Sequence, residues 1–285
     1  FLGVKGIYVH VLYPKGKVSE IQEKQFTTLG QNISALEIDG TFDDCQALVK
    51  SAFMDLEIKK KLTITSANSI NVARFLPQAF YYFNAYAKLP DKNKKIVIAV
   101  PSGNFGNLTA GLFAKRMGLP VNKFIAANNR NDVVYNYLNT GAFEPRPSVT
   151  TLANAMDVGD PSNFARILDL YTNDYDAIVK DIIGTTCSDD QIRETIDVVY
   201  NTLGYLLDPH GAVGYRALKE KINSGENGIF LETAHPAKFT ETVGKIIGKE
   251  NVPMPQRLYE FMKRDKLSIP LPSSYRTFRD YLGSL

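Results

Sequence analysis

A turn of small and polar residues is the part of the sequence best suited to bind a ligand. It follows the apolar run 96–100, precedes the helix-like segment 108–117, and consists of Ser102, Gly103, Asn104, Phe105, Gly106 and Asn107. Such a turn gathers backbone N–H groups at the positive end of a helix dipole, which suits a phosphate dianion. No lysine or acidic residue stands where a P-loop or a dinucleotide-binding sequence has one, so we expect a ligand with a single terminal phosphate. The alternative is a tight β-to-α connection that binds nothing.

A second candidate lies where another strand-like run ends, in the sequence Glu232, Thr233, Ala234, His235 and Pro236. Ligands of open α/β sheets bind at the carboxyl ends of the strands. The neutral hydroxyl of Thr233 is suited to hydrogen-bond a ring nitrogen without protonating it, whereas a carboxylate there would hold a pyridine as pyridinium. The alternative is that Thr233 and His235 only cap the helix that starts at Pro236.

A third candidate is a group of uncharged donors and one arginine before an expected helix, namely Asn68, Ser69, Asn71 and Arg74. An arginine in the first turn of a helix opposes the helix dipole. Its presence is explained if the guanidinium reaches an anion, to which its planar fork donates two hydrogen bonds. A solvated arginine is the alternative. The sequence Asp208, Pro209, His210, Gly211 is a further loop that turns into a helix, and we expect no direct chemical role for His210.

The elements that must position these residues alternate between strand and helix patterns. Up to residue 90, strand signals at 7–12 and 35–38 are separated by helices with clear starts, because Ser19 with Gln22 and Thr41 with Asp44 place capping residues before apolar stripes. After residue 96, continuous apolar runs at 96–100, 123–127 and 228–232 indicate a buried parallel sheet. Residues 152–207 are expected to be mainly helical, and the prolines after residue 252 predict an irregular surface tail.

Composition limits the classes of protein that this chain can belong to. Its 285 residues are 44% hydrophobic, and 33 basic against 30 acidic residues give a net charge of +3 without a long charged run, so we expect no nucleic-acid partner. Two distant cysteines predict neither a metal site nor a disulfide framework, and they favour a cytoplasmic location. No apolar run is long enough to cross a membrane. Because the chain opens at Phe1 almost directly with a strand, we expect an N-terminally truncated fragment.

Several sequence segments, taken in order, resemble those of the threonine synthase family. That family belongs to the fold-type II pyridoxal-phosphate enzymes, which also include the tryptophan synthase β subunit. The resemblance runs from residue 1 to about residue 247. The segments that show this resemblance are residues 12–19, 25–29, 40–46, 68–71, 100–107 and 233–239. It implies an α/β fold of three layers, with two lobes of open parallel sheets and helices on both faces. The smaller lobe would end at residue 90, and the larger would comprise 91–285 with a helical insertion at about 152–207.

The resemblance also implies a reaction in which O-phospho-L-homoserine and water give L-threonine and phosphate, with pyridoxal 5'-phosphate as cofactor. Residues 102–107 would hold the cofactor phosphate, and Thr233 would face the pyridine nitrogen. Asn68, Ser69, Asn71 and Arg74 would meet the carboxylate or phosphate of the substrate. The protein would be a monomer or homodimer with a small-molecule substrate, without a nucleic acid, membrane or metal.

One departure from the family concerns the catalytic lysine. The family's Schiff-base lysine belongs to a segment before the first strand of this chain, so no catalytic residue is expected here, and Lys238 is expected to be structural. The chain would then be inactive alone. One alternative is a binding protein for pyridoxal phosphate or a phosphate ligand that has lost catalysis. A phosphosugar- or nucleotide-binding enzyme is another, although Asn128, Asn129 and Arg130 follow the second strand instead of an acidic residue. A purely structural or regulatory domain is the third.

Overall fold

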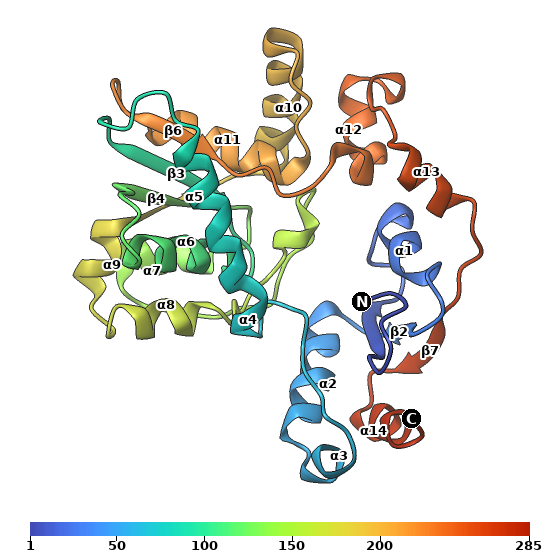
Figure 1. The fold of residues 1–285 in the computed structure, drawn as a ribbon. Helices are drawn as coiled ribbons and strands as arrows, with labels where there is room; N and C mark the ends of the chain where they lie inside the picture. The colour runs from blue at the N-terminus through green and yellow to red at the C-terminus, as the bar shows by residue number, and fades with distance from the viewer. The chain divides into compact units, whose positions relative to one another are not determined.

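The chain forms two compact α/β units, which the computed structural model describes over all of residues 1–285. One unit combines Phe1–Thr65 with Pro253–Leu285, and the other is Ser66–Val252. Every strand pairing within them is parallel, and helices flank the sheets (Figure 1). The predicted α/β class with open parallel sheets is therefore confirmed.

The first unit is built on a three-stranded sheet in the order β1-β2-β7. Its elements are β1 (Val9–Pro14), α1 (Glu20–Thr27), β2 (Ile33–Asp39), α2 (Phe42–Met54), α3 (Leu56–Lys61), α13 (Gln256–Met262), β7 (Ile269–Pro272) and α14 (Tyr275–Gly283). Leu36 and Ile38 of β2 are fully buried in a core with residues of α2, α3 and α14. Ser19 forms the predicted capping box with Gln22, and Thr41, predicted as a helix start, forms a second capping box with Asp44.

The C-terminal segment corrects the expectation of an irregular tail. Residues 269–272 form β7, which pairs in parallel with β2, and α14 follows it. Pro270 and Pro272 are compatible with this strand because β7 lies at the edge of the sheet, where one side of the backbone has no strand partner. Lys266, just before β7, donates to Glu23 of α1 at 2.8 Å and to Glu37 of β2 at 2.6 Å.

The second unit is built on a four-stranded sheet in the order β5-β4-β3-β6. Its strands are β3 (Ile96–Pro101), β4 (Lys123–Asn128), β5 (Ile182–Thr186) and β6 (Asn227–Phe230). Its α-helices are α4 (Val72–Phe75), α5 (Ala79–Ala87), α6 (Gly106–Arg116), α7 (Val133–Thr140), α8 (Phe164–Leu170), α9 (Tyr175–Asp181), α10 (Asp189–Leu203), α11 (Pro209–Lys221) and α12 (Thr240–Ile247). Short 3-10 helices are η1 (Leu76–Gln78), η2 (Asn154–Met156), η3 (Pro236–Phe239) and η4 (Lys249–Asn251).

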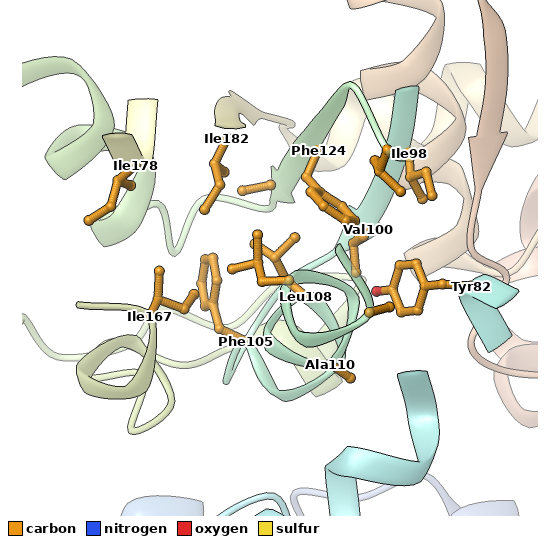
Figure 2. Close-up of a cluster of buried hydrophobic side chains, with 14 of the residues drawn as sticks. Tyr82, Ile98, Val100, Phe105, Leu108, Ala110, Phe124, Ile167, Ile178 and Ile182 are labelled. Atoms are coloured by element: carbon orange, nitrogen blue, oxygen red, sulfur yellow. The ribbon is translucent and has the colours of Figure 1, made fainter. Parts of the chain in front are cut away.

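Both faces of this second sheet are covered by helices, which explains the continuous apolar runs. Every residue of β3 is buried, and alternate side chains point to opposite faces. Ile98 and Val100 join a core with residues of α5 to α9, part of which is drawn in Figure 2. Val97 and Ala99 join a separate core with residues of α10, α11 and α12. The unit therefore has three layers, α/β/α (Figure 1).

The unit boundaries differ from the predicted lobes at 1–90 and 91–285. Residues 66–90 belong to the second unit because α5 packs on α6, where Tyr82 is fully buried and its hydroxyl lies 2.8 Å from the Asn107 carbonyl oxygen. Residues 253–285 belong to the first unit through β7. The segment 152–207 also contains a strand that the helical pattern missed, β5, which pairs with β4.

No helix of this structure combines the length and the apolar composition that crossing a membrane requires.

The packing between α5 and α6 leads to a first prediction. A Cβ added at Gly111 of α6 would lie 2.6 Å from Cε1 of Tyr82 and 2.8 Å from Cε1 of Phe124. Overpacking of this kind costs about 1–3 kcal/mol, so Gly111→Ala should lower the free energy of unfolding in urea by that amount. In the control variant Gly283→Ala the new methyl group meets no atom within 4 Å, and stability should hold or rise. Equal effects of the two changes would contradict this packing.

Candidate functional site

The turn between β3 and α6 presents a row of free backbone donors. Phe105, the residue before α6, has a left-handed backbone with φ of 61°, and its side chain is buried in the core beside α6 (Figure 2). A large residue is rarely found in this region of φ and ψ, and burial of the ring holds it there. The first N–H groups of a helix have no acceptor within it. No hydrogen bond runs from the backbone N–H groups of residues 103–107 to any other group of the chain.

The two glycines of the turn are required by contacts with other parts of the protein. A Cβ at Gly103 would lie 2.6 Å from Cα of Met156 and 3.0 Å from the carbonyl oxygen of Ala155, both in η2. A Cβ at Gly106 would lie 3.1 Å from Cβ of Ser69. The close approach of neighbouring segments therefore requires glycine at both positions.

The polar side chains of the turn bind other segments and fix its shape. Ser102 is 2% exposed, its hydroxyl donates to the Val100 carbonyl at 2.8 Å, and its N–H donates to the Ala127 carbonyl at 2.9 Å. Both donors of Ser102 are thus engaged within the protein. The side-chain oxygen of Asn104 accepts from the Ser162 N–H at 2.7 Å, and its amide nitrogen donates to the hydroxyl of Ser69 at 2.7 Å. Among the predicted cofactor residues, the side chains of Ser102 and Asn104 therefore fix the shape of the turn, whereas residues 103–107 offer backbone N–H donors.

Residues after Met156 support the turn from outside, and they were not among the predicted site residues. The side-chain amide of Asn163 donates to the Asn104 carbonyl at 2.8 Å. Arg166 donates to Oδ1 of Asn163 at 2.7 Å and to the Ile70 carbonyl at 2.6 Å, so it connects the turn with the segment 68–71. Asn163 is fully buried in the structure. The signal available in the sequence was an asparagine just before a helical pattern.

The four substrate candidates lie in one segment, and the structure brings only part of it to the turn. Ser69 contacts Asn104 as described, whereas the side-chain oxygen of Asn68 accepts from the N–H of Ser69 at 2.7 Å. Asn71 caps α4 by accepting from the Ala73 N–H at 3.0 Å. Arg74 is exposed in α4, which has four residues. Because α4 continues directly into η1 and α5, Arg74 lies in the first turn of a longer helical segment, and its role stays a prediction.

Thr233 lies at the same end of the sheet as the turn. β6 pairs with β3 so that Phe230 stands opposite Ala99, and the Leu231 N–H continues the ladder to the Ala99 carbonyl at 3.1 Å. Ser102 and Thr233 each come three residues after that pair. Thr233 is exposed and lines a cavity of about 450 Å³ together with Tyr205, Leu206, Glu232, Ala234, His235, Pro236 and Lys238. His235 caps η3, since its Nδ1 accepts from the Ala237 N–H at 3.1 Å.

A group of ionisable side chains, of which Asp208 and His210 are buried and Glu232 is exposed, lies next to Thr233. Asp208 is fully buried, and its Oδ1 lies 2.6 Å from Nδ1 of His210. Burial acts to raise the pKa of Asp208, but the interactions with His210 and the hydrogen bond with Glu232 together outweigh it, and the pKa lies below its ordinary value. Glu232 accepts from the Asp208 N–H at 3.2 Å, and its carboxyl packs over Gly211. Burial of this carboxyl and the nearby Asp208 carboxylate raise the pKa of Glu232 to about 8.

The donor set at the turn fits a phosphate group. Five consecutive residues, 103–107, leave their N–H groups unbonded at the start of an α-helix of 11 residues. Backbone donors at a helix start bind phosphate without a cationic side chain. A planar ring attached to that phosphate would extend along the carboxyl ends of β3 and β6, where Thr233 offers a neutral hydroxyl.

Comparison with known proteins agrees with this geometry. A family profile described as "Pyridoxal-phosphate dependent enzyme" matches residues 2–231, and one described as "Threonine synthase, C-terminal" matches residues 211–282. The curated threonine synthase of Serratia marcescens is 48% identical over 286 aligned residues, which cover 100% of this chain and 66% of that protein. The chain thus spans just under two thirds of the length of this relative.

Two solved structures are similar over nearly the whole chain. The crystal structure of threonine synthase from Escherichia coli has a TM-score of 0.93 and 46% identity, and covers 100% of this chain and 66% of its own. The structure of pyridoxal-phosphate-bound threonine synthase from Brucella melitensis has a TM-score of 0.88 and 35% identity, and covers 99% of this chain and 66% of its own.

The raised pKa of Glu232 predicts a specific pH dependence. A carboxyl whose pKa rises from its ordinary 4.5 to about 8 on folding makes the folded chain bind more protons between these values, so stability falls as pH rises through that window. The variant Glu232→Gln keeps the acceptor for Asp208 and cannot ionise. Its melting temperature should match that of the wild type near pH 5 and exceed it above pH 8.

The control for this measurement is Glu144→Gln, which changes an exposed glutamate of the same unit. Its melting temperature should follow the wild type at every pH. A difference between wild type and Glu232→Gln that stays constant from pH 5 to pH 9 would contradict the assignment of this titration to Glu232.

Proposed function

This chain belongs to the family of pyridoxal-phosphate dependent enzymes, and we propose that it forms most of a threonine synthase, a lyase that converts O-phospho-L-homoserine and water to L-threonine and inorganic phosphate. The observation that carries the proposal is the row of unbonded N–H groups at residues 103–107. The identity to threonine synthases over the whole chain supports the choice of substrate.

In this proposal the turn holds the cofactor phosphate through its backbone. The N–H groups of residues 103–107 donate to the phosphate oxygens, while Ser102 and Asn104 keep the turn in shape through their hydrogen bonds to neighbouring segments. Fixed backbone donors at a helix start hold a dianion without rearrangement, because the dipole and the N–H directions are set by the fold. Asn107 is held in turn by Tyr82.

Thr233 is proposed to orient the other end of the cofactor. When bound, pyridoxal phosphate supplies an electron sink that stabilises negative charge developing on the substrate. The Thr233 hydroxyl would donate to the pyridine nitrogen and leave it unprotonated, since a hydroxyl is too weak an acid to transfer its proton. Thr233 is exposed at the cavity wall, so its hydroxyl is accessible to a ligand.

The substrate's anionic groups are assigned to the segment 68–74. Arg74 is exposed, and its guanidinium is suited to a phosphate or carboxylate because it donates two parallel hydrogen bonds. Ser69 is held beside the turn by Asn104, with Asn68 next to it in the chain and Asn71 at the start of α4. Charge on both the substrate and the cofactor phosphate would then be neutralised by donors on adjacent segments.

We further propose that none of the lysines of this chain binds the cofactor covalently. Lys238 is the lysine that lines the cavity with Thr233, and it lies in η3 between the buried residues Ala237 and Phe239. This position favours a structural role. The proposal also includes a monomer or homodimer in the cytoplasm, to which the two buried free thiols, Cys45 and Cys187, lend support.

The proposal predicts reversible, phosphate-sensitive cofactor binding by the chain. Pyridoxal phosphate titrated against the purified chain should bind with a change in its absorbance, and inorganic phosphate should displace it. Thr233→Val should weaken cofactor affinity by about tenfold, the effect of one hydrogen bond, without changing the affinity for inorganic phosphate. Thr63→Val, at an exposed threonine of the other unit, serves as the matched control and should change neither affinity.

The same sample tests the assignment of the lysine. Borohydride treatment followed by peptide mapping should give no stoichiometric label on a single lysine. Such a label at Lys238 would contradict the lysine assignment, and binding that phosphate leaves unaffected would contradict the role of residues 103–107.

A further inference from the structure

The start of α11 holds a buried histidine whose two ring nitrogens are both engaged. His210 is 3% exposed, its Nδ1 lies 2.6 Å from Oδ1 of Asp208, and its Nε2 lies 3.2 Å from the backbone nitrogen of Ala155. A ring nitrogen that accepts from a backbone N–H carries no proton. The hydrogen-bond pattern therefore assigns the neutral ring with the proton on Nδ1, and Asp208 fixes this tautomer.

Ala155 connects this ring directly to the phosphate-binding turn. The carbonyl oxygen of Ala155 and the Cα of Met156 form the surface on which Gly103 rests, at distances that exclude even a Cβ. The far end of the same loop is held by Asp157, whose carboxylate accepts from Asn129 at 2.8 Å and from Thr151 at 2.7 Å. The position of Gly103 thus depends on η2, and η2 is fixed on one side by His210.

The same group of residues also reaches Thr233. Glu232 accepts from the N–H of Asp208 and directly precedes Thr233 in the chain. The ring of His210 packs against Phe239 of η3, with 4.9 Å between ring centroids. A helix cap requires only the carboxylate of Asp208 and its bonds to the first N–H groups of α11. The bond from the ring to Ala155 has no part in capping.

We propose that His210 is a positioning residue for cofactor binding: it holds η2 against Gly103 and thereby fixes the N–H groups of residues 103–107 in the arrangement that receives the phosphate. This inference rests on the proposed function and adds a residue that touches neither cofactor nor substrate. The tautomer matters to it, because a proton on Nε2 would remove the acceptor for the Ala155 N–H.

Two substitutions at His210 each keep one of the two hydrogen bonds of the ring, either that to Asp208 or that to Ala155. His210→Asn places an amide donor near the position of Nδ1, so it keeps the bond to Asp208 and lacks an acceptor for Ala155. His210→Gln places an amide oxygen near the position of Nε2 and keeps that acceptor. Both lose the ring contact with Phe239, so their comparison sets the loss of the bond to Ala155 against the loss of the bond to Asp208. Ala155→Pro removes the N–H donor while leaving His210 intact, and it serves if His210→Asn does not fold.

The control variant for a lost buried hydrogen bond is Tyr171→Phe. The Tyr171 hydroxyl lies 2.8 Å from Oδ2 of Asp181, and the residue is 5% exposed in the core on the opposite face of the sheet. Removal of this hydroxyl should lower the melting temperature without changing the structure of the turn at residues 103–107.

The first measurement is amide hydrogen exchange, in the chain without ligand, at Met156 and Asp157, whose N–H groups donate to the carbonyl oxygens of Ala153 and Asn154 at η2. His210→Asn and Ala155→Pro should speed this exchange about tenfold, the effect of losing one hydrogen bond, while His210→Gln and Tyr171→Phe should stay near the wild type. The second is the affinity for inorganic phosphate and for pyridoxal phosphate, which should fall about tenfold in the same two variants only.

Exchange at Met156 and Asp157 that is unchanged in His210→Asn and in Ala155→Pro would overturn the positioning role, whatever the affinities. Failure of the wild type to bind either probe would overturn the proposed function instead, and the exchange comparison would still decide the role of His210. Equal loosening by His210→Gln and His210→Asn would also count against the inference, since it would assign the effect to ring packing.

Discussion

The close approach between Gly103 and η2 is the constraint on which the candidate site depends. A Cβ at Gly103 would lie only 2.6 Å from Cα of Met156, so the contact leaves no room for any residue but glycine. This contact places the turn after β3, and the buried ring of Phe105 with its left-handed backbone starts α6 directly after it. The N–H groups of residues 103–107 remain unbonded as a result, and a phosphate is the ligand that satisfies such a set.

The surrounding segments all act on this one turn. Asn163 and Arg166 hold it from the side of α8, Tyr82 holds Asn107 from α5, and His210 supports the loop beneath Gly103. These residues are spread over more than 120 positions of the chain, from Tyr82 to His210. Their hydrogen bonds give the donors a fixed direction before any ligand arrives, which is how a backbone site without a lysine or arginine gains affinity.

Much of the site could be predicted because it is local in sequence. The apolar run before Ser102 and the glycines after it identify a strand, a turn and a helix within about twenty residues, and the run before Thr233 identifies a neighbouring strand end. The capping boxes at Ser19 and Thr41 were equally local. What remained hidden depends on pairing between distant segments. Pro270 and Pro272 argued against a strand, and only the edge position of β7 beside β2 makes them compatible with one.

The supporting residues were hidden for the same reason. His210 looked like one residue of a helix start, and its role comes from Ala155, which lies 55 positions earlier. Arg74 attracted attention through its place in the first turn of a helix, whereas Arg166, inside an ordinary helix pattern, is the arginine that joins Ile70 to the turn. A single sequence therefore indicates the residues that could contact a ligand more readily than the distant residues that position them.

The most direct test of the account is a nuclear magnetic resonance titration of the isotope-labelled chain with inorganic phosphate, following the backbone amide signals. The account predicts that the largest shifts fall on residues 103–107, saturate together, and leave the signals of the other unit unchanged. Saturable shifts centred on another segment, with the amides of 103–107 unmoved, would contradict the claim that this turn is the phosphate site.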